Sequence, residues 1–163
     1  MLRLEPGQAI PYQWGLQSPI IHSMKPRPEL LAAYQATTYY VQLTNRRIAI
    51  RIGETSPEMT EMMIRHEVGS WVFITACNPL SKQLPAKDNN KRLDQLAGAL
   101  AARGLEYFPG EGIGDAGAWP CERSYLVLGM NLEEASALGR EFGQYAFVFG
   151  RFNKPAQLVW CNE

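Results

Sequence analysis

The sequence predicts an α+β domain in which helices pack on a mixed or antiparallel sheet. Two periodicities indicate this class: apolar residues alternate with polar ones in one segment, as in a half-buried strand, and recur every three or four positions in others, as in an amphipathic helix. No internal repeat or linker divides the chain. At 163 residues it has the length of one domain with a substantial core.

The first 28 residues are expected to form an irregular arm. They are rich in proline and glutamine and have no apolar period, and Pro11, Pro19, Pro26 and Pro28 would interrupt a helix or a central strand. The domain itself is expected to span residues 29–163.

A short helix over residues 29–34 and then a strand hairpin are predicted next. Residues 37–43 are dense in Thr, Tyr and Val, a composition typical of strands. The segment after them alternates three isoleucines with polar or small residues: Ile48, Ile50 and Ile52. This period of two predicts a half-buried strand, and the turn residues Asn45 and Arg46 predict that it pairs with the preceding one.

Three longer helices are indicated by their start signals and spacing. Ser56 before Pro57 offers a hydroxyl cap and a first-turn proline, which predicts a helix that runs to about residue 68. Leucines at helical spacing predict a second helix over residues 90–103. Asn131, followed by two glutamates, predicts the cap of a third helix that reaches about residue 142.

Short apolar or aromatic runs predict the remaining strands, at residues 71–75, 105–108, 124–128, 145–149 and 156–160. The first of these runs is almost entirely apolar, as expected of a strand buried on both faces. With the helices between them, the strands from residue 71 to residue 149 follow the order β-α-β-β-α-β. The second half of the chain is therefore expected to be a ferredoxin-like split unit.

Charge and cysteine content disfavour several classes of protein. Lys plus Arg and Asp plus Glu each number 16, so no overall field attracts nucleic acid or an anionic membrane. The longest strongly apolar stretch, residues 71–77, is far shorter than the roughly 20 residues of a membrane span. The three cysteines and two histidines have neither a disulfide pattern nor the spacing of a zinc site. We therefore expect a cytoplasmic protein with no membrane contact and no metal.

The loop after residues 71–75 carries the densest set of candidate binding residues. It presents hydroxyl, amide and guanidinium groups between a strand end and a helix start, where α/β proteins often bind ligands. The candidates are Thr75, Asn78, Ser81, Asn89 and Arg92. A purely structural interpretation stays open, because Asn-Pro starts turns and any of residues 88–90 would cap the helix.

The segment before the strand at residues 124–128 supplies an acid–base candidate. Glu122 lies close in sequence to Trp119, and partial burial would raise the pKa of its carboxyl group and suit it to proton transfer. The alternative is a surface ion pair with Arg123. Ser124 and Gln144 are further candidates for ligand contacts, each at an expected element boundary.

Residues 112–117, Gly-Ile-Gly-Asp-Ala-Gly, match the letters of the dinucleotide-binding fingerprint. That fingerprint requires a helix directly after it, and Ala-Trp-Pro follows here, so a Rossmann fold is rejected. A glycine-rich flap over a site and a plain hairpin loop both stay open.

Several separated motifs occur in order along the chain. They are Tyr34…Thr37…Tyr39, Ile52-Gly53-Glu54, Ile74-Thr75-Ala76-x-Asn78-Pro79-x-Ser81, Asn89-x-x-Arg92, Pro109-Gly110-x-Gly112, Trp119-x-x-Glu122-x-Ser124 and Gly143-Gln144-x-Ala146. In this combination the chain resembles, from about residue 30 to residue 160, a bacterial domain family of unknown function. The resemblance implies no activity and no cofactor. It implies Trp in place of Cys77 and a polar residue in place of Tyr145, which disfavours a catalytic thiol, and it favours one shared polar site in the loops.

The leading functional hypothesis is one polar site for a small molecule, nucleotide-like or otherwise anionic. Asparagine and serine side chains would supply hydrogen bonds, Arg92 a positive charge and Trp119 a stacking surface. If the protein is an enzyme, hydrolysis or group transfer with Glu122 activating water is the simplest class. The sequence identifies no cofactor.

The alternative is a protein–protein interaction module without catalytic activity, which forms a homodimer or presents its arm to a partner. RNA binding is a weaker alternative: aromatic residues at 145–149 resemble a stacking platform, but the balanced charge argues against it.

Overall fold

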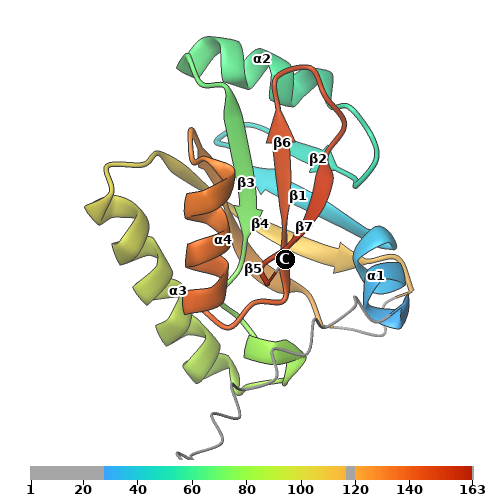
Figure 1. Ribbon diagram of the computed structural model, residues 1–163, viewed down its shortest axis with the longest axis vertical. Helices are drawn as coiled ribbons and strands as arrows, with labels where there is room; N and C mark the ends of the chain where they lie inside the picture. The colour runs from blue at the N-terminus through green and yellow to red at the C-terminus, as the bar shows by residue number, and fades with distance from the viewer. Residues whose placement is uncertain (1–27, 117–119, 163) are drawn as a thin grey trace, which may run out of the picture.

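The computed structural model describes residues 28–116 and 120–162, which form four α-helices and one seven-stranded sheet (Figure 1). The helices are α1 (Pro28–Gln35), α2 (Pro57–His66), α3 (Ala86–Ala102) and α4 (Leu132–Glu141), and a 3₁₀ turn, η1, spans Pro79–Ser81. The strands are β1 (Thr37–Gln42), β2 (Arg47–Ile50), β3 (Ser70–Ile74), β4 (Tyr107–Gly114), β5 (Glu122–Leu128), β6 (Ala146–Arg151) and β7 (Gln157–Trp160). The expected arm, except Pro28, and Trp119 lie outside the described residues.

The sheet has the strand order β2-β1-β4-β5-β3-β6-β7, and each neighbouring pair is antiparallel. The α+β class and the antiparallel sheet predicted from the sequence are therefore confirmed. Within it, the elements from β3 to β6 place their strands in the order β4-β5-β3-β6. The strand predicted to be buried on both faces, β3, lies between β5 and β6, and Trp71 to Ile74 are all buried.

Helices α3 and α4 cover one face of this sheet (Figure 1). Leu96 and Leu100 of α3 pack with Leu138 of α4 against apolar side chains of β3, β5 and β6, as the leucine spacing predicts. The start of α3 differs from the prediction: the helix begins at Ala86 behind Pro85, and Asn89 and Asn90 lie inside it. The proline fixes the backbone at this end without a side-chain cap, and the amide of Asn89 is bonded to the preceding loop instead.

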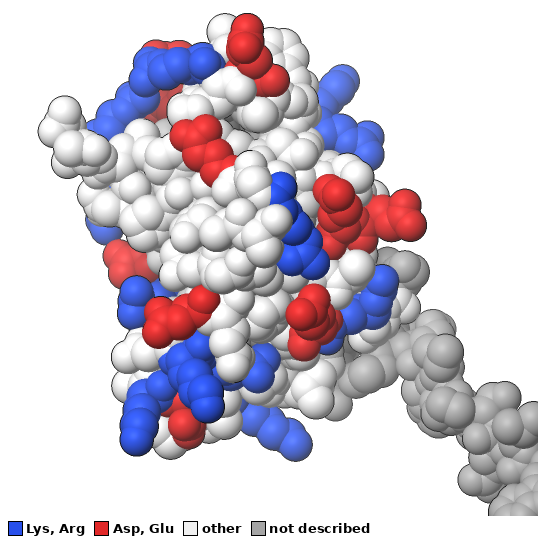
Figure 2. Space-filling model, turned by 90° about the vertical axis from the view of Figure 1, so that its left-hand side faces the viewer, with Lys and Arg blue, Asp and Glu red and all other residues white. Residues whose placement is uncertain are grey.

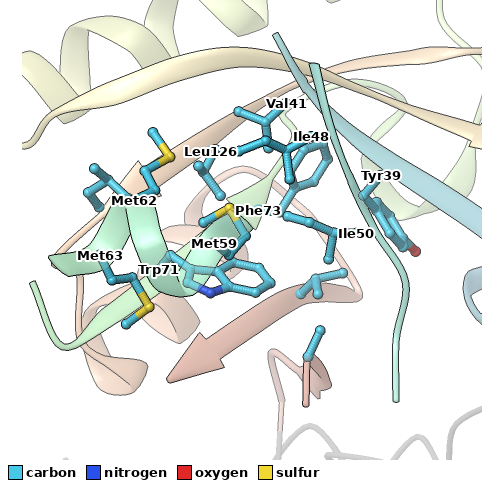
Figure 3. Close-up of a cluster of buried hydrophobic side chains, with 13 residues drawn as sticks. Tyr39, Val41, Ile48, Ile50, Met59, Met62, Met63, Trp71, Phe73 and Leu126 are labelled. Atoms are coloured by element: carbon cyan, nitrogen blue, oxygen red, sulfur yellow. The ribbon is translucent and has the colours of Figure 1, made fainter. Parts of the chain in front are cut away.

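The concave face of the sheet packs against α2. Met59, Met62 and Met63 point from this helix into a cluster that contains Trp71, Phe73 and branched side chains of β1 and β2 (Figure 3). The predicted helix start is confirmed, because the hydroxyl oxygen of Ser56 accepts a hydrogen bond from the Met59 amide at 3.2 Å. Unbranched methionines fit the irregular space above the curved strands.

Close contacts between glycines and aromatic rings allow the sheet to curl. A Cβ atom on Gly150 would overlap the Trp71 ring, and one on Gly110 would lie 2.7 Å from the Phe73 ring. Without side chains at these positions the rings can lie directly against the neighbouring strands. The curl brings the two edges of the sheet together, where Ile52 pairs with Ala156 and the Gly53 amide donates to the Ala156 carbonyl at 2.8 Å.

Strand β4 corrects the prediction for the glycine-rich segment. The sequence predicted a strand that ends at residue 108, followed by a flap or a loop, whereas β4 continues to Gly114 and pairs with both β1 and β5. Glycine normally weakens a strand, but here pairing on both sides stabilises the backbone. Residues 112–114 are therefore neither a flap nor a loop.

Acidic and basic side chains are interspersed on the face shown in Figure 2. None of the helices in the described part of the chain is long and apolar enough to cross a membrane.

Replacing Gly110 with alanine should lower the free energy of unfolding by about 1–3 kcal/mol, because the new methyl group overlaps the Phe73 ring and the Tyr40 carbonyl. Gly112→Ala on the same strand is the matched control, since its Cβ would have no atom nearer than 3.5 Å. Urea denaturation of both variants measures the difference. Equal stabilities would show that the close contact does not constrain the sheet.

Candidate functional site

A cavity of about 260 Å³ lies between α1 and the part of the concave face that α2 does not cover. Strands β1, β3, β4, β5 and β6 all contribute to its walls. In Figure 1, α2 lies across the top of the sheet, whereas α1 lies lower on the right. The curled sheet thus holds an apolar core at one end and an open cavity at the other, a usual position for ligand sites in curved sheets.

Most of the cavity wall is apolar or aromatic. Tyr39, Phe73 and Val148 line it from β1, β3 and β6, and Leu30 and Tyr34 line it from α1. Gly112 and Gly114 of β4 also face the cavity, and a Cβ on Gly114 would have no atom within 4 Å. The absence of side chains on this stretch of β4 therefore leaves the space open.

Five of the residues predicted from the sequence line the cavity: Thr75, Ser81, Glu122, Ser124 and Gln144. They gather because the antiparallel register places Glu122 opposite Gly112 and Ser124 opposite Gly110, beside the end of β3. The structure thus brings these five residues from separated motifs together at one cavity.

Two of these side chains also hold the neighbouring backbone. The Thr75 hydroxyl donates to the Arg123 carbonyl at 2.6 Å and accepts from the Cys77 amide at 3.0 Å. The Gln144 amide nitrogen donates to the carbonyls of Cys77 and Phe142, at 3.0 and 3.3 Å. Together they fix the loop after β3 against β5 and the end of α4.

Glu122 is held by a buried asparagine. Asn78 is only 8% exposed, and its side-chain amide nitrogen donates to Oε1 of Glu122 at 2.8 Å. Its carbonyl oxygen accepts from the Leu84 amide and from Nδ2 of Asn89, both at 2.9 Å. Asn89 Oδ1 in turn accepts from the Asn78 backbone at 2.9 Å. This reciprocal pair therefore fixes the direction in which Asn78 presents its donor to the carboxylate.

The predicted residues Asn78, Asn89 and Arg92 lie outside the cavity lining. Arg92 donates to the carbonyls of Ala76 and Phe142, which ties the loop to the end of α4. The guanidinium group is thus used for backbone contacts rather than turned toward the cavity. All three residues hold the loop or the Glu122 side chain in place without lining the cavity. Trp119 lies outside the described residues, so its predicted stacking role stays a prediction.

The loop after β3 contains several residues with left-handed backbone. Asn78, Leu80 and Ser81 have φ values of 48°, 53° and 55°. A left-handed conformation costs non-glycine residues of the order of 1 kcal/mol or more, and such residues are concentrated at functional sites. Gly143 allows this geometry because it has no side chain: a Cβ atom at this position would lie only 2.9 Å from the Cβ of Pro79. The Gly143 carbonyl also accepts a hydrogen bond from the Leu80 amide at 2.7 Å.

Three residues at the other side of the cavity were missed by the sequence reasoning. Asp115 and Tyr34 line the wall, and Arg51 binds Asp115 through two N–O contacts of 3.0 and 3.1 Å. Arg51 also donates to Thr38 Oγ1 at 2.7 Å and to the Gln35 carbonyl at 3.2 Å. One guanidinium group therefore joins α1, β1 and the end of β4. Tyr34 belongs to the first of the ordered sequence motifs, and that motif was the feature of the sequence that could have identified it as a site residue.

Burial and the charge of Glu122 set the protonation of nearby groups. Burial raises the pKa of Tyr34, and the Glu122 carboxylate raises it further, so the phenol stays protonated. Burial likewise raises the pKa of the Cys77 thiol, which disfavours a nucleophilic thiolate. Among residues 28–116 and 120–162, no cluster of His, Cys, Asp or Glu side chains is arranged to hold a metal ion.

A comparison with known families finds one related model. A family described as "Protein of unknown function (DUF3293)" matches residues 74–147. The match begins at the end of β3 and includes the loop, Glu122 and Gln144, but it does not reach α1, β1 or β2. No curated protein and no solved structure is significantly similar to the chain.

Replacing Asn78 with alanine should lower the free energy of unfolding by about 1–3 kcal/mol, because the Leu84 amide and Asn89 lose their buried partner. Asn90→Ala removes an exposed amide from α3, the helix that carries Asn89, and should change stability by about 0.5 kcal/mol or less. Urea denaturation compares the two variants. Equal effects would contradict the supporting role of Asn78.

The ion pair between Arg51 and Asp115 predicts an acid-dependent contribution to stability. The adjacent guanidinium lowers the pKa of Asp115, so the pair stabilises the fold above the usual aspartate pKa and this contribution disappears as pH falls below it. The stability gap between the parent and Asp115→Asn should therefore shrink below a pH of about 4.

Unfolding measured across the acid range checks this expectation. The same comparison is repeated in an Arg51→Gln background, with and without the Asp115→Asn substitution. There the stability gap should be smaller and less dependent on pH, because the partner charge is absent. A gap that is unchanged in that background would contradict the pairing.

Proposed function

We propose that the protein binds a small molecule in the cavity between α1 and the concave face of the sheet, with Glu122 contacting the polar part of the ligand. One observation carries the proposal: Asn78 holds the Glu122 carboxylate at the polar side of an otherwise mostly apolar cavity. Apolar walls with a few positioned polar groups are typical of ligand sites. The supporting network and the strained loop agree with a preorganised site.

Glu122 is also the acid–base candidate of this site, and hydrolysis or group transfer is the reaction class that we propose for it. Asp115, the other carboxylate of the wall, is bound by Arg51 on the far side and has a lowered pKa, which suits it to a structural role. Neither cofactor nor substrate is specified by these contacts.

The nucleotide-like or anionic ligand expected from the sequence is not supported by the cavity. Arg92, which was to supply the positive charge, donates to backbone carbonyls. The described lining contains Glu122 and Asp115 but no lysine, arginine or histidine. The described lining residues therefore offer an anion no positive charge.

We further propose that the elements from β3 to β6 are a ferredoxin-like split unit of a cytoplasmic bacterial protein. The strand order β4-β5-β3-β6 with α3 and α4 on one face supports the first part, and the family match supports a domain of unknown function. The interaction-module alternative, including a homodimer, depends on the N-terminal arm, whereas the cavity favours a ligand-binding role.

A thermal-shift screen against metabolites tests the binding proposal. A ligand at about a hundredfold over its dissociation constant should stabilise the folded protein by about 2.7 kcal/mol. Glu122→Gln should weaken the response, and Gly114→Leu should abolish it by placing a side chain in the cavity.

Glu111→Gln is the matched control, because Glu111 lies on neighbouring β4 but does not line the cavity. It should respond like the parent. Stabilisation by a ligand that persists in both Glu122→Gln and Gly114→Leu would place the binding site elsewhere.

A further inference from the structure

Gln144 is a buried polar residue of the cavity wall, and its hydrogen bonds fix the direction of its amide group. The residue is 8% exposed and lines the cavity. Its side-chain nitrogen Nε2 donates to the carbonyls of Cys77 and Phe142, at 3.0 and 3.3 Å. Because a carbonyl oxygen can only accept, these two contacts identify Nε2 and leave Oε1 as the acceptor end of the amide.

The Oε1 atom of Gln144 is available to a donor that enters the cavity. In the described part of the chain, the side-chain hydrogen bonds of Gln144 are the two made by Nε2. No fully buried side-chain nitrogen or oxygen atom of the described residues lacks a partner, so Oε1 is accessible. The residue is otherwise buried and lines the cavity, which places this acceptor at the cavity.

Four hydroxyl groups of the cavity lining donate their protons to the backbone. Thr37, Thr75 and Tyr39 each donate to a backbone carbonyl, at 2.7, 2.6 and 3.0 Å. Ser124 donates to another carbonyl at 3.3 Å. These four residues line the cavity and therefore offer a ligand lone pairs rather than protons. A ligand that donates a hydrogen bond suits such a wall better than one that only accepts.

We propose that the ligand of this cavity is a mainly apolar molecule with an N–H or O–H group that donates a hydrogen bond to Oε1 of Gln144. Its apolar body packs between α1 and the rings of Tyr39 and Phe73, whose centroids lie 5.3 Å apart. A volume of about 260 Å³ lies just below the usual range of roughly 300–1,000 Å³ for ligand pockets, which favours a body of one ring or a short chain.

The inference rests on the small-molecule site proposed above and specifies its ligand class. It adds Gln144 as a recognition residue and does not depend on the contacts of Glu122. A fixed acceptor selects for a donor, because a ligand without one leaves the acceptor unpaired in a largely apolar enclosure.

Two probes of the same shape test the hydrogen bond: benzamide carries an NH₂ group where acetophenone carries a methyl group, and both keep the ring and the carbonyl. Their dissociation constants are measured by NMR titration with the full chain. A purely apolar cavity would favour acetophenone, since the amide group is costly to remove from water. We expect benzamide to bind at least as tightly, because the bond to Oε1 offsets that cost.

Variants separate the role of Oε1 from that of the loop. Gln144→Met replaces the amide with an apolar chain of similar length and should shift the ratio of the two dissociation constants at least about fivefold toward acetophenone. Arg92→Met is the matched control, since Arg92 also donates to the Phe142 carbonyl but lies outside the cavity lining. It should keep the ratio of the parent. Circular dichroism and urea denaturation verify that each variant is folded.

A measurement on the parent protein is independent of how the variants fold. The carbon NMR signal of the Gln144 side-chain carbonyl responds to a hydrogen bond at Oε1. Saturating benzamide should shift this signal, and saturating acetophenone should shift it less, because only benzamide has a donor.

Two kinds of failure are distinguishable. The donor ligand class is wrong, while the cavity remains a binding site, if the parent binds acetophenone more tightly, if the ratio is the same in Gln144→Met, if it shifts equally in Arg92→Met, or if both probes shift the Gln144 signal alike. If neither probe binds at millimolar concentration, the donor ligand class is also overturned. If, in addition, no member of the broader metabolite screen stabilises the parent, the proposed small-molecule site fails as well.

Discussion

The close packing of two aromatic rings against glycines is the constraint on which the rest of the structure depends. Trp71 and Phe73 of the central strand lie where a Cβ on Gly150 or Gly110 would be. The sheet can therefore curl until Ile52 meets Ala156 across its two edges. The concave face that results is filled by α2 at one end and left open beside α1 at the other. A flat sheet would provide no such enclosure.

Some residues of the site face the cavity, and others hold those residues in position through hydrogen bonds. Glu122 faces the cavity, whereas Asn78 and Asn89 form a reciprocal amide pair behind it. Arg92 fixes the same loop to the end of α4. This arrangement explains why the loop tolerates left-handed backbone at non-glycine residues: hydrogen bonds from several elements offset the conformational cost.

Local sequence patterns predicted most of the helices and strands. They failed where contacts between distant segments determine the structure. Ser56 and Asn131 cap their helices as predicted, because a cap depends on a few neighbouring residues. The second half of β4 was missed, since its glycines resemble a loop and only pairing with β1 and β5 makes them a strand. The loop motifs drew attention to several polar residues that line the cavity, among them Glu122 and Gln144. They could not show that Arg92 turns toward carbonyls or that Arg51 and Asp115 meet from distant segments.

The central claim is that the cavity beside α1 is a binding site, and mapping backbone amide shifts by NMR with a mixed small-fragment library tests it most directly. The account predicts that fragments which bind will shift the amides of Gly112, Gly114, Ser124 and Gln144, whose residues line the cavity on two strands and beyond the end of α4. Shifts confined to the outer face of α3 and α4, with these amides unchanged, would contradict it.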